Sequence, residues 1–518
     1  GIKMSKWLDN AIFYQIYPQS FCDTNSDGIG DINGIIKNLD YVKELGCNAI
    51  WLNPCYLSPF DDGGYDIEDY YTVAPRYGTN EDLINLFNEV HKRNMHIILD
   101  MVPGHTSYKH KWFKESCKDK KNEYTDRYIW TNSIWNAPNN MQWIRGIGQR
   151  DGAVAVNYFS TQPALNYGYL NPNDEWQQSV DSEGPAATKE ELKKIMRFWL
   201  KAGCDGFRVD MADSLVKNDD ENSSGTVALW QEFRKFLDKE FPEAVMVSEW
   251  GQPDKSLKGG FHMDFLLHFG PSHYNDLFRC DEPYFSSRGK GKVSDFIETY
   301  IKNYEQSERR GLICIPSGNH DMDRLARRLT VEEIKIAFAF LLSMPGAPFI
   351  YYGDEIGLNY VENITSVEGG FGRTGSRSPM QWNKGLNAGF SSAPEEKLYI
   401  PLDKNLDRPD VVTQIEDSNS LYNEVKHLIS IRMSHKPLQS NGQIEFITKS
   451  EYPLVYKRSY ENETILVIIN PSRESQIIET DVSCGEIIYS YGGSIKIIDE
   501  KAVNIDGCTA VFIKFKED

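Results

Sequence analysis

The chain has 518 residues, of which 40% are hydrophobic and 25% are charged, an ordinary balance for a globular protein. Its net charge of −19 excludes nucleic acid and anionic membranes as expected partners, because both are bound through basic patches. One large α/β domain with small appendages fits this length better than several equal domains, because α/β barrels often exceed about 250 residues.

The nine cysteines are odd in number, and no two are spaced as a C-x-x-C pair. Cys47 and Cys314 stand in apolar runs and are expected to be buried free thiols, which favours a reducing compartment and a cytoplasmic location. The sequence has no apolar run of about 18 residues that could span a bilayer. Residues 1–4 lack the apolar segment of a secretory signal.

The N-terminal part of the chain alternates short apolar runs, typical of strands, with helical patterns. We expect its strands at residues 11–17, 49–52 and 97–99. A helix over 33–45 separates the first two, because apolar residues recur there at helical spacing and stop at Gly46. Another helix begins at Thr79, where Asp82 completes a capping box.

The alternation breaks after Met101 and resumes at Thr188, where Glu191 is expected to complete another capping box and Gly203 to end the helix. We expect further strands at residues 206–209, 245–248, 264–268, 312–315 and 349–352. Eight such units with right-handed crossovers close into an α/β (β/α)8 TIM barrel. A doubly wound open sheet is the alternative, but no G-x-G-x-x-G motif follows the first strand.

Two regions depart from the barrel pattern. Residues 104–178, after the third strand, are rich in Asn, Gly, Trp and Pro, and an insertion of that length is expected to form a subdomain B. Beyond residue 435 the pattern changes to short β runs. The predicted domains are the catalytic barrel over 1–103 and 179–434, subdomain B over 104–178, and an antiparallel all-β C-terminal domain over 435–518.

Polar side chains follow the predicted barrel strands where each strand ends. In chain order they are Asp100, His105, Arg208, Asp210, Glu249, His320 and Asp321. Barrel enzymes build their sites at this end of the strands, so we expect these side chains to share one rim. A metal site is the alternative for the two histidines, but no H-x-x-x-H pair or cysteine partner accompanies them.

Cleavage of a glycosidic bond commonly needs two carboxyl groups, one protonated acid and one ionised nucleophile or base. Arg208 and Asp210 stand two residues apart on one strand, so their side chains point to the same face. There the cation favours the charged carboxylate. An Arg–Asp pair alone is more often structural, so only the combination with Glu249 indicates this chemistry.

Four segments resemble the signature regions of the α-amylase family, in the family's order. They are residues 100–105 (DMVPGH), 206–210 (GFRVD), 248–250 (SEW) and 318–321 (GNHD). Residues 377–382 (RSPMQW) and 387–390 (NAGF) resemble the oligo-1,6-glucosidase and α-glucosidase-like branch, which includes trehalose synthases. The resemblance covers nearly the whole chain.

The resemblance implies a role for each matching position. Asp210 would be the nucleophile, Glu249 the general acid/base, and Asp321 the third catalytic acid, which grips two ring hydroxyls. The implied substrate-binding residues are Asp62, Tyr65, Asp100, His105, Arg208, His320 and Arg377. Among them the histidines would bind hydroxyls, the tyrosine would stack under the ring, and Arg208 would hold Asp210 with support from Asp100. Asp62 and Arg377 would close the pocket around a terminal glucose.

Three positions depart from the family pattern. Gly104 stands where many members carry an asparagine that ligates calcium in α-amylases, which argues against that calcium site here. Ala164 replaces the aspartate of the branch's usual QPDLN. Met211 follows the nucleophile, where the branch carries valine for α-1,6 or a smaller residue for α-1,4 preference, so the linkage preference stays open.

Residues 23–31 (DTNSDGIGD) carry a separate signal. Alternate oxygens with a glycine after the third match the first half of a calcium loop, but an EF-hand needs a glutamate at its twelfth position, where Gly34 stands. A polar turn is the alternative. The corresponding loop of the oligo-1,6-glucosidase branch resembles this one and holds calcium, so we expect structural calcium and no organic cofactor. The expected ligands are Asp23, Asn25, Asp27, the Ile29 carbonyl and Asp31.

The leading hypothesis is a retaining glycoside hydrolase that removes terminal glucose from short α-linked gluco-oligosaccharides through a covalent glycosyl-Asp. A trehalose- or isomaltulose-type transglycosylase or isomerase shares that intermediate, and an endo-acting α-amylase fits residues 377–382 less well. A transporter-associated or sugar-binding relative would not need both Asp210 and Glu249. We expect a small oligosaccharide as the partner and a monomer or small homo-oligomer.

Overall fold

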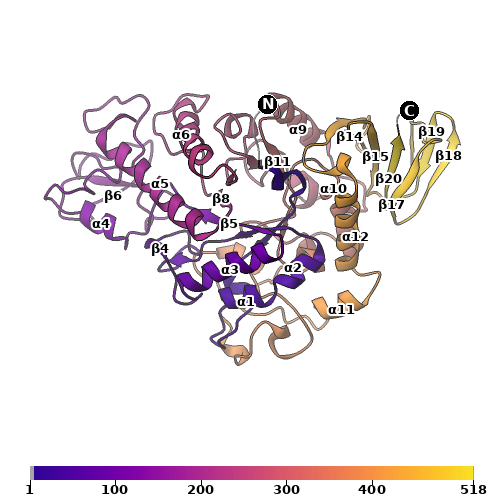
Figure 1. Cartoon of the computed structure of the whole chain (residues 1–518), viewed down its shortest axis with the longest axis horizontal. Helices are drawn as coiled ribbons and strands as arrows, with labels where there is room; N and C mark the ends of the chain where they lie inside the picture. Colours follow the sequence, from indigo (N-terminus) through magenta and orange to yellow (C-terminus); the bar gives the residue numbers. More distant parts are fainter. Residues whose placement is uncertain (1–4, 517–518) are drawn as a thin grey trace.

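A closed sheet of eight parallel strands forms the centre of the molecule in the computed structural model, which describes residues 5–516; residues 1–4 lie outside it (Figure 1). Its strands are β1 (Phe13–Ile16), β2 (Ala49–Leu52), β5 (His96–Met101), β8 (Gly206–Val209), β9 (Val245–Ser248), β10 (Met263–Phe265), β11 (Leu312–Cys314) and β12 (Phe349–Tyr351). They neighbour one another in chain order, and a parallel bridge between Pro316 and Phe349 joins the last two. The predicted TIM barrel is confirmed.

The interior of the barrel is filled by side chains. Phe13 stacks on Phe349 with ring centroids 4.3 Å apart, and Trp51 of β2 approaches Phe265 of β10 across the barrel at 5.9 Å. All the barrel strands are almost completely buried, as expected for parallel strands covered on both faces. Because the interior is packed, a ligand has room only at the strand ends.

Amphipathic helices surround the barrel. The long ones are α3 (Asn80–Lys92), α5 (Glu183–Ala202), α6 (Ser224–Glu240), α9 (Ser294–Gln306), α10 (Val331–Leu341) and α12 (Leu421–Ser434). The short ones are α1 (Ile32–Lys37), α2 (Leu39–Leu45), α4 (Lys111–Ser116), α7 (Pro253–Ser256), α8 (Asn275–Phe278) and α11 (Val411–Glu416). The predicted capping box of Thr79 and Asp82 at the start of α3 is confirmed.

Three predicted elements differ in the structure. The capping box at Thr188 is wrong: α5 already begins at Glu183, with Pro185 in its first turn, and the Thr188 hydroxyl donates to the Gly184 carbonyl. The helix predicted over 33–45 is divided into α1 and α2 at Asn38, whose side chain donates to a backbone carbonyl of α1. The strand predicted over 264–268 ends at Phe265, three residues early.

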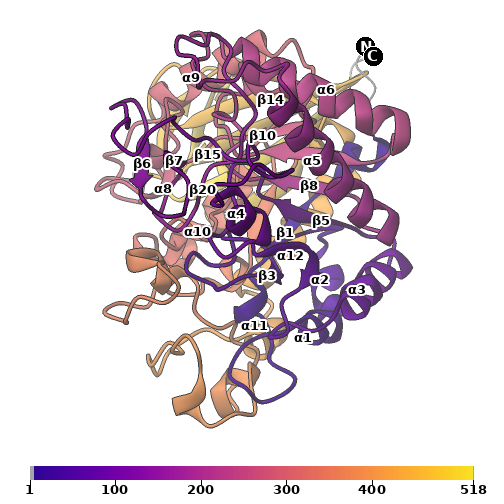
Figure 2. The same cartoon turned by 90° about the vertical axis from the view of Figure 1, so that its left-hand side faces the viewer.

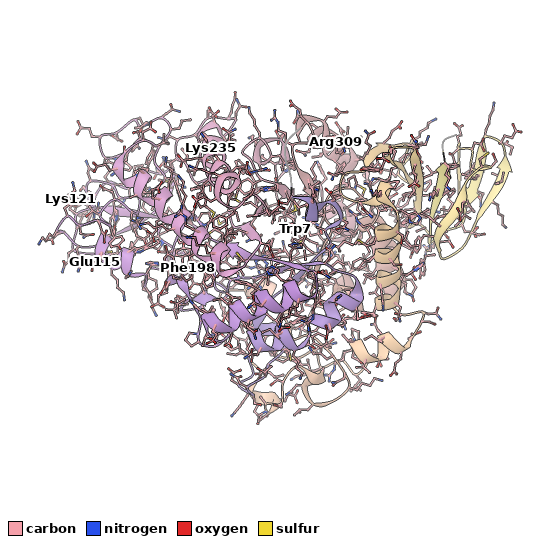
Figure 3. All side chains as sticks on the ribbon, in the orientation of Figure 1. Trp7, Glu115, Lys121, Phe198, Lys235 and Arg309 are labelled. Atoms are coloured by element: carbon pink, nitrogen blue, oxygen red, sulfur yellow. The ribbon has the colours of Figure 1, made fainter. Side chains whose placement is uncertain are left out.

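The inserted segment lies against one end of the barrel. It contains α4 and a two-stranded sheet of β6 (Gln142–Arg145) and β7 (Ala153–Val156), which Figure 2 shows in front of the barrel strands. Within it, a bridge pairs Ala164 with His105, four residues after the end of β5. Figure 3 shows Glu115 and Lys121 at its outer edge. A hairpin of β3 (Tyr56–Leu57) and β4 (Asp69–Val73) precedes α3.

The C-terminal region is antiparallel, as predicted. One sheet contains β13 (Gln443–Phe446), β14 (Leu454–Tyr460), β15 (Glu463–Asn470), β20 (Thr509–Lys516) and β17 (Glu486–Tyr491). The other contains β16 (Gln476–Ile478), β19 (Ala502–Ile505) and β18 (Ile495–Asp499). The buried Arg458 donates to the backbone carbonyls of Leu438 and Gly442 at 3.0 and 3.2 Å, and also to Ser343 after α10, which joins these sheets to the barrel.

All nine cysteines are free thiols, and Cys47 and Cys314 are buried, as predicted. Within residues 5–516 no helix combines the length and the apolar character needed to cross a bilayer.

Candidate active site

The predicted strand-end residues meet in a cavity of about 330 Å³. Those that line it are Asp62, Tyr65, His105, Asp210, Glu249, His320, Asp321 and Arg377. Asp100 and Arg208 lie beneath them, fully buried. Larger hollows of about 770 and 490 Å³ elsewhere on the surface contain neither Asp210 nor Glu249, so the chemistry is assigned to the smaller cavity.

Arg208 is the centre of the acidic cluster. It stands on β8 two residues before Asp210, and its Nη1 atom lies 3.0 Å from Oδ1 of Asp210 and 3.1 Å from Oδ1 of Asp100. Its Nη2 atom lies 2.9 Å from Oε2 of Glu249, which follows the neighbouring strand β9. One guanidinium thus holds three carboxyl groups that come from three adjacent strands.

Asp100 anchors this arrangement from below. Its Oδ2 atom accepts hydrogen bonds from the Tyr65 hydroxyl at 2.8 Å and from Trp51 Nε1 at 3.0 Å. Burial raises the pKa of Asp100 to about 6, although Arg208 opposes the shift. Because uncompensated buried charge is costly, three carboxyl groups around one cation favour keeping a proton in the cluster.

Asp210 and Glu249 are both buried beside Arg208, and burial favours the protonated form of each carboxyl group. Burial raises the pKa of Asp210 to about 7, against the opposing effect of Arg208. Burial raises the pKa of Glu249 to about 8, with Arg208 again opposing and the charge of Asp210 adding to the increase. The charge of Asp210 thus raises the pKa of Glu249 further, which is the direction expected for an acid beside an ionised nucleophile.

Asp321 faces this pair and stays ionised. Its Oδ1 atom lies 2.7 Å from Arg373 Nη1 and 3.2 Å from Arg377 Nη2, and its Oδ2 atom lies 3.3 Å from His320 Nε2. Burial alone would raise the pKa of Asp321, but these neighbours lower it. His320 Nδ1 is 3.1 Å from the Gln15 amide nitrogen, so the ring proton is on Nε2, facing Asp321.

Comparison with known proteins agrees with this geometry. Residues 15–441 match the family model for the catalytic domain of alpha amylase. The chain belongs to the α-amylase family of glycoside hydrolases. The oligo-1,6-glucosidase of Parageobacillus thermoglucosidasius is 32% identical over 91% of this chain and 91% of its own. The trehalose synthase/amylase TreS of Mycolicibacterium smegmatis is 30% identical over 92% of this chain and 86% of its own.

Solved structures give the same result. A mutant of the isomaltulose synthase of Erwinia rhapontici NX5, in complex with its natural substrate sucrose, aligns with a TM-score of 0.81 at 26% identity. The alignment covers 99% of this chain and 100% of that chain. The α-amylase resemblance of the sequence is therefore confirmed, and the glucosidase-like branch is among the relatives.

His105 is fully engaged by the protein in this α-amylase family member. Its Nε2 atom donates to the Tyr65 carbonyl at 2.9 Å, and its Nδ1 atom lies 3.0 Å from the amide nitrogen of Asn157. Burial lowers the pKa of His105 to about 4, so the ring is neutral. To bind a sugar hydroxyl, as the resemblance implies, one ring nitrogen of His105 must contact that hydroxyl in addition to its present protein partner.

Asn157 explains the unusual Gly104 of this α-amylase relative. The Asn157 amide donates to the Gly104 carbonyl at 3.1 Å, and a Cβ atom at position 104 would lie 3.0 Å from that amide nitrogen. An amide from the inserted segment thus occupies the space beside the position where many family members carry asparagine. Sequence reasoning identified the departure at Gly104 but not its partner.

Asp62 and Tyr65 are positioned by a tight turn between β3 and β4. The Asp66 carboxylate accepts the backbone N–H of Asp62 at 3.2 Å, and Gly63 and Gly64 turn the chain with φ angles of +57° and +93°. The Asp62 carboxylate accepts the Gln162 amide at 2.7 Å. Burial raises its pKa to about 7, against this hydrogen bond and nearby arginines.

Several lining residues were missed by sequence reasoning. They are Tyr158, Asp213, His268, Phe269 and Arg373, whereas Met211, noted for its bearing on linkage preference, also lines the cavity. Arg373 stands four residues before Arg377, the first residue of the RSPMQW segment. This nearness to Arg377 is the only sequence signal that could have indicated Arg373. Its guanidinium carbon lies 5.7 Å from the ring centroid of Tyr158, and one of its Nη atoms lies 4.0 Å from Asp62. Arg373 therefore links both acids, Asp62 and Asp321, at one side of the cavity.

The predicted calcium loop is a closed turn outside the cavity. The side-chain amide of Asn25 lies 2.9 Å from a carboxylate oxygen of Asp23 and 2.9 Å from one of Asp27. Burial raises the pKa of Asp27, and Asp23 and Asp31 add to the shift. Asp31 also caps α1 by accepting from the Gly34 N–H at 2.8 Å. The Asn25 nitrogen donates to both carboxylates in this arrangement, and Asp23, Asp27 and Asp31 do not converge as one group of metal ligands within residues 5–516.

Proposed function

We propose that this protein is a retaining α-glucosidase that removes terminal glucose from short α-linked gluco-oligosaccharides. The observation that carries the proposal is that the Arg208 guanidinium contacts both Asp210 and Glu249, through Nη1 at 3.0 Å and Nη2 at 2.9 Å. Carboxylates that share one guanidinium lie close together. Two carboxyl groups at one guanidinium supply the pair that glycoside cleavage needs, and the retaining mechanism is proposed from the resemblance to the glucosidase branch.

The reaction follows from the protonation states. The ionised Asp210 attacks the anomeric carbon while Glu249 gives its proton to the departing glycosidic oxygen, which leaves a glucosyl ester on Asp210. Glu249, now ionised, takes a proton from water as that water attacks the anomeric carbon of the glucosyl ester. The ester bond breaks, Asp210 becomes ionised again, and glucose leaves with its α configuration retained.

The arginine-linked acids support an exo mode of action. Asp62 and Asp321 are joined through Arg373, and Arg377 adds a second cation 3.2 Å from Asp321. These charged pairs offer hydrogen-bond partners for the hydroxyls of one terminal ring. We propose that these pairs bound the terminal-glucose end of the cavity, so that a longer chain would extend from the opposite end.

A transglycosylase or isomerase is the second candidate. Two exposed aromatic rings line the cavity, Tyr158 at 58% exposure and Phe269 at 42%, and such faces can hold an acceptor sugar. The relatives named as trehalose synthase and isomaltulose synthase favour the same candidate. The covalent step on Asp210 would be unchanged, and only the acceptor would differ.

A product profile separates these candidates. The purified protein is given maltose, isomaltose, trehalose, sucrose, panose and a long maltodextrin, and the products are resolved by chromatography. Glucose alone from the short substrates supports the glucosidase. An isomeric disaccharide supports the isomerase, and mixed maltodextrins from the polymer would overturn the exo assignment.

We also propose a structural calcium ion in the loop over residues 23–31, held by Asp23, Asn25, Asp27, the Ile29 carbonyl and Asp31. The ion would neutralise the loop and take no part in the reaction, because the loop lies outside the cavity. The nine free thiols support a reducing, cytoplasmic location. We propose a monomer or small homo-oligomer as the working form.

A further inference from the structure

His268 and Phe269 lie on the Glu249 side of the cavity. They follow β10, which pairs with β9 so that Asp264 lies opposite Ser248, the residue before Glu249. A Cβ atom at Gly251 would lie 3.7 Å from the Phe269 ring. Because Glu249 protonates the departing oxygen, the departing sugar must lie on its side of the scissile bond. His268 and Phe269 therefore border the leaving-group position.

The imidazole of His268 is available for a ligand. Its Nδ1 atom is buried and has no hydrogen-bond partner within residues 5–516. Its Nε2 atom is not enclosed in this way, and the residue lines the cavity. An unpaired buried N–H costs more than an unpaired buried lone pair, so the proton belongs on Nε2, at the accessible side of the ring.

The surroundings of His268 keep the ring neutral and hold its position. Burial lowers its pKa; Asp321 opposes the shift, and Arg279 and Arg373 add to it. The Phe269 ring packs edge-on against the imidazole at 5.2 Å between centroids. A neutral imidazole with a free N–H beside an exposed aromatic face is a combination that binds a sugar: the face stacks and the N–H donates to a hydroxyl.

We propose that His268 Nε2 donates a hydrogen bond to a hydroxyl of the leaving-group sugar, and that it selects sugar over water as the acceptor of the glucosyl group on Asp210. The inference rests on the proposed function, because it needs a glucosyl-enzyme at Asp210. It assigns the partition between hydrolysis and transfer to a residue that does not touch the reacting atoms.

The test compares substrates that differ only in the leaving group. The leaving group of maltose and isomaltose is a glucose with hydroxyls, whereas the leaving group of α-glucosyl fluoride is a fluoride ion, which has none. In His268→Ala we expect kcat/KM for the disaccharides to fall about 10-fold, the effect of one neutral hydrogen bond. The value for α-glucosyl fluoride should stay within about twofold.

Two further variants separate binding from structure. His268→Gln places an amide near the position of Nε2 and should recover most of the disaccharide activity. His273→Ala removes a histidine outside the cavity, five residues along the chain, and should change neither substrate. With α-glucosyl fluoride as donor and glucose as acceptor, the ratio of transfer to hydrolysis should fall about 10-fold in His268→Ala only.

The outcomes are distinguishable. Equal losses on the fluoride and the disaccharides would show a structural role for His268 and overturn the inference, as would no loss on either. Both results leave the proposed function intact, because the unmodified protein is active in them. If the unmodified protein cleaves none of the three substrates, the proposed function fails, and the inference falls with it.

Discussion

The two sides of the cavity are built differently. On the donor side, Asp210 and Glu249 directly follow barrel strands, Asp321 lies on the loop after β11, and all three are held by arginines. On the leaving-group side, the buried Nδ1 atom of His268 has no hydrogen-bond partner within the described chain, and Phe269 is 42% exposed. We propose that the cross-linked groups perform the chemistry and that the loop groups select which sugar leaves or enters.

The sharpest test of the donor side is Asp210→Asn. The amide has the same shape but cannot form a glucosyl ester, so kcat/KM for an aryl α-glucoside should fall by about 10⁴-fold or more. The melting temperature should stay within a few degrees, because Arg208 keeps Asp100 and Glu249 as partners. Asp238→Asn, on the surface of α6, is the matched control and should be fully active. Near-normal turnover by Asp210→Asn would remove the nucleophile assignment.

Arg373→Ala tests whether the charged pairs around Asp321 belong to the donor side. Loss of the 2.7 Å contact removes one of two arginines from Asp321 and the link to Asp62, so kcat/KM should fall about 10–100-fold for every glucoside. Arg327→Ala, whose partners Asp323 and Glu362 lie outside the cavity, is the control. A fall in kcat/KM only for glucosides with a sugar leaving group would assign Arg373 to the leaving-group side.

The pH dependence separates the roles of Asp210 and Glu249 on the donor side. Below a pH of about 7 Asp210 takes up a proton and stops acting as a nucleophile, and above about 8 Glu249 loses its proton and stops acting as an acid. The kcat/KM for maltose should therefore follow a narrow bell, with each limb changing about 10-fold per pH unit.

α-Glucosyl fluoride supplies the control for this profile. Fluoride leaves without needing a proton, so its kcat/KM should keep the acidic limb from Asp210 and lose most of the alkaline limb. An alkaline limb of equal steepness for both substrates would show that some group other than Glu249 produces it.

The donor side was predictable because it follows from simple periodicity. A strand alternates its side chains, and barrel strands end at one rim, so Arg208, Asp210 and Glu249 could be placed together before the structure was known. The leaving-group side was not. Leu266 and Leu267 prolong the apolar run of β10 in the sequence, which made His268 look like part of a strand rather than a cavity residue.

The positions of Arg373 and Asn157 could not be predicted from sequence periodicity either. Arg373 lies in a 3-10 turn over Phe371–Ser376, and Asn157 just after β7, where no period indicates which way a side chain points. Their partners Asp321 and Gly104 are 52 and 53 residues away in the chain. Contacts of this kind depend on how loops from separate units meet, which only the tertiary structure determines.

Calcium removal is expected to have the smallest effect on activity. The loop over residues 23–31 is tied to the segment after β12 by the Ser391 hydroxyl, which donates to Asp23 at 2.6 Å, and by the Tyr399 N–H on the Gly28 carbonyl (Figure 2 shows this segment beside α1). A chelator should leave Asp23 and Asp27 repelling each other, so the melting temperature should drop by several degrees. Activity at ambient temperature should change less than twofold, since neither carboxylate reaches the cavity. Asp27→Asn should reproduce the drop and abolish the response to chelator; an unchanged melting temperature in both cases would leave the loop as a polar turn.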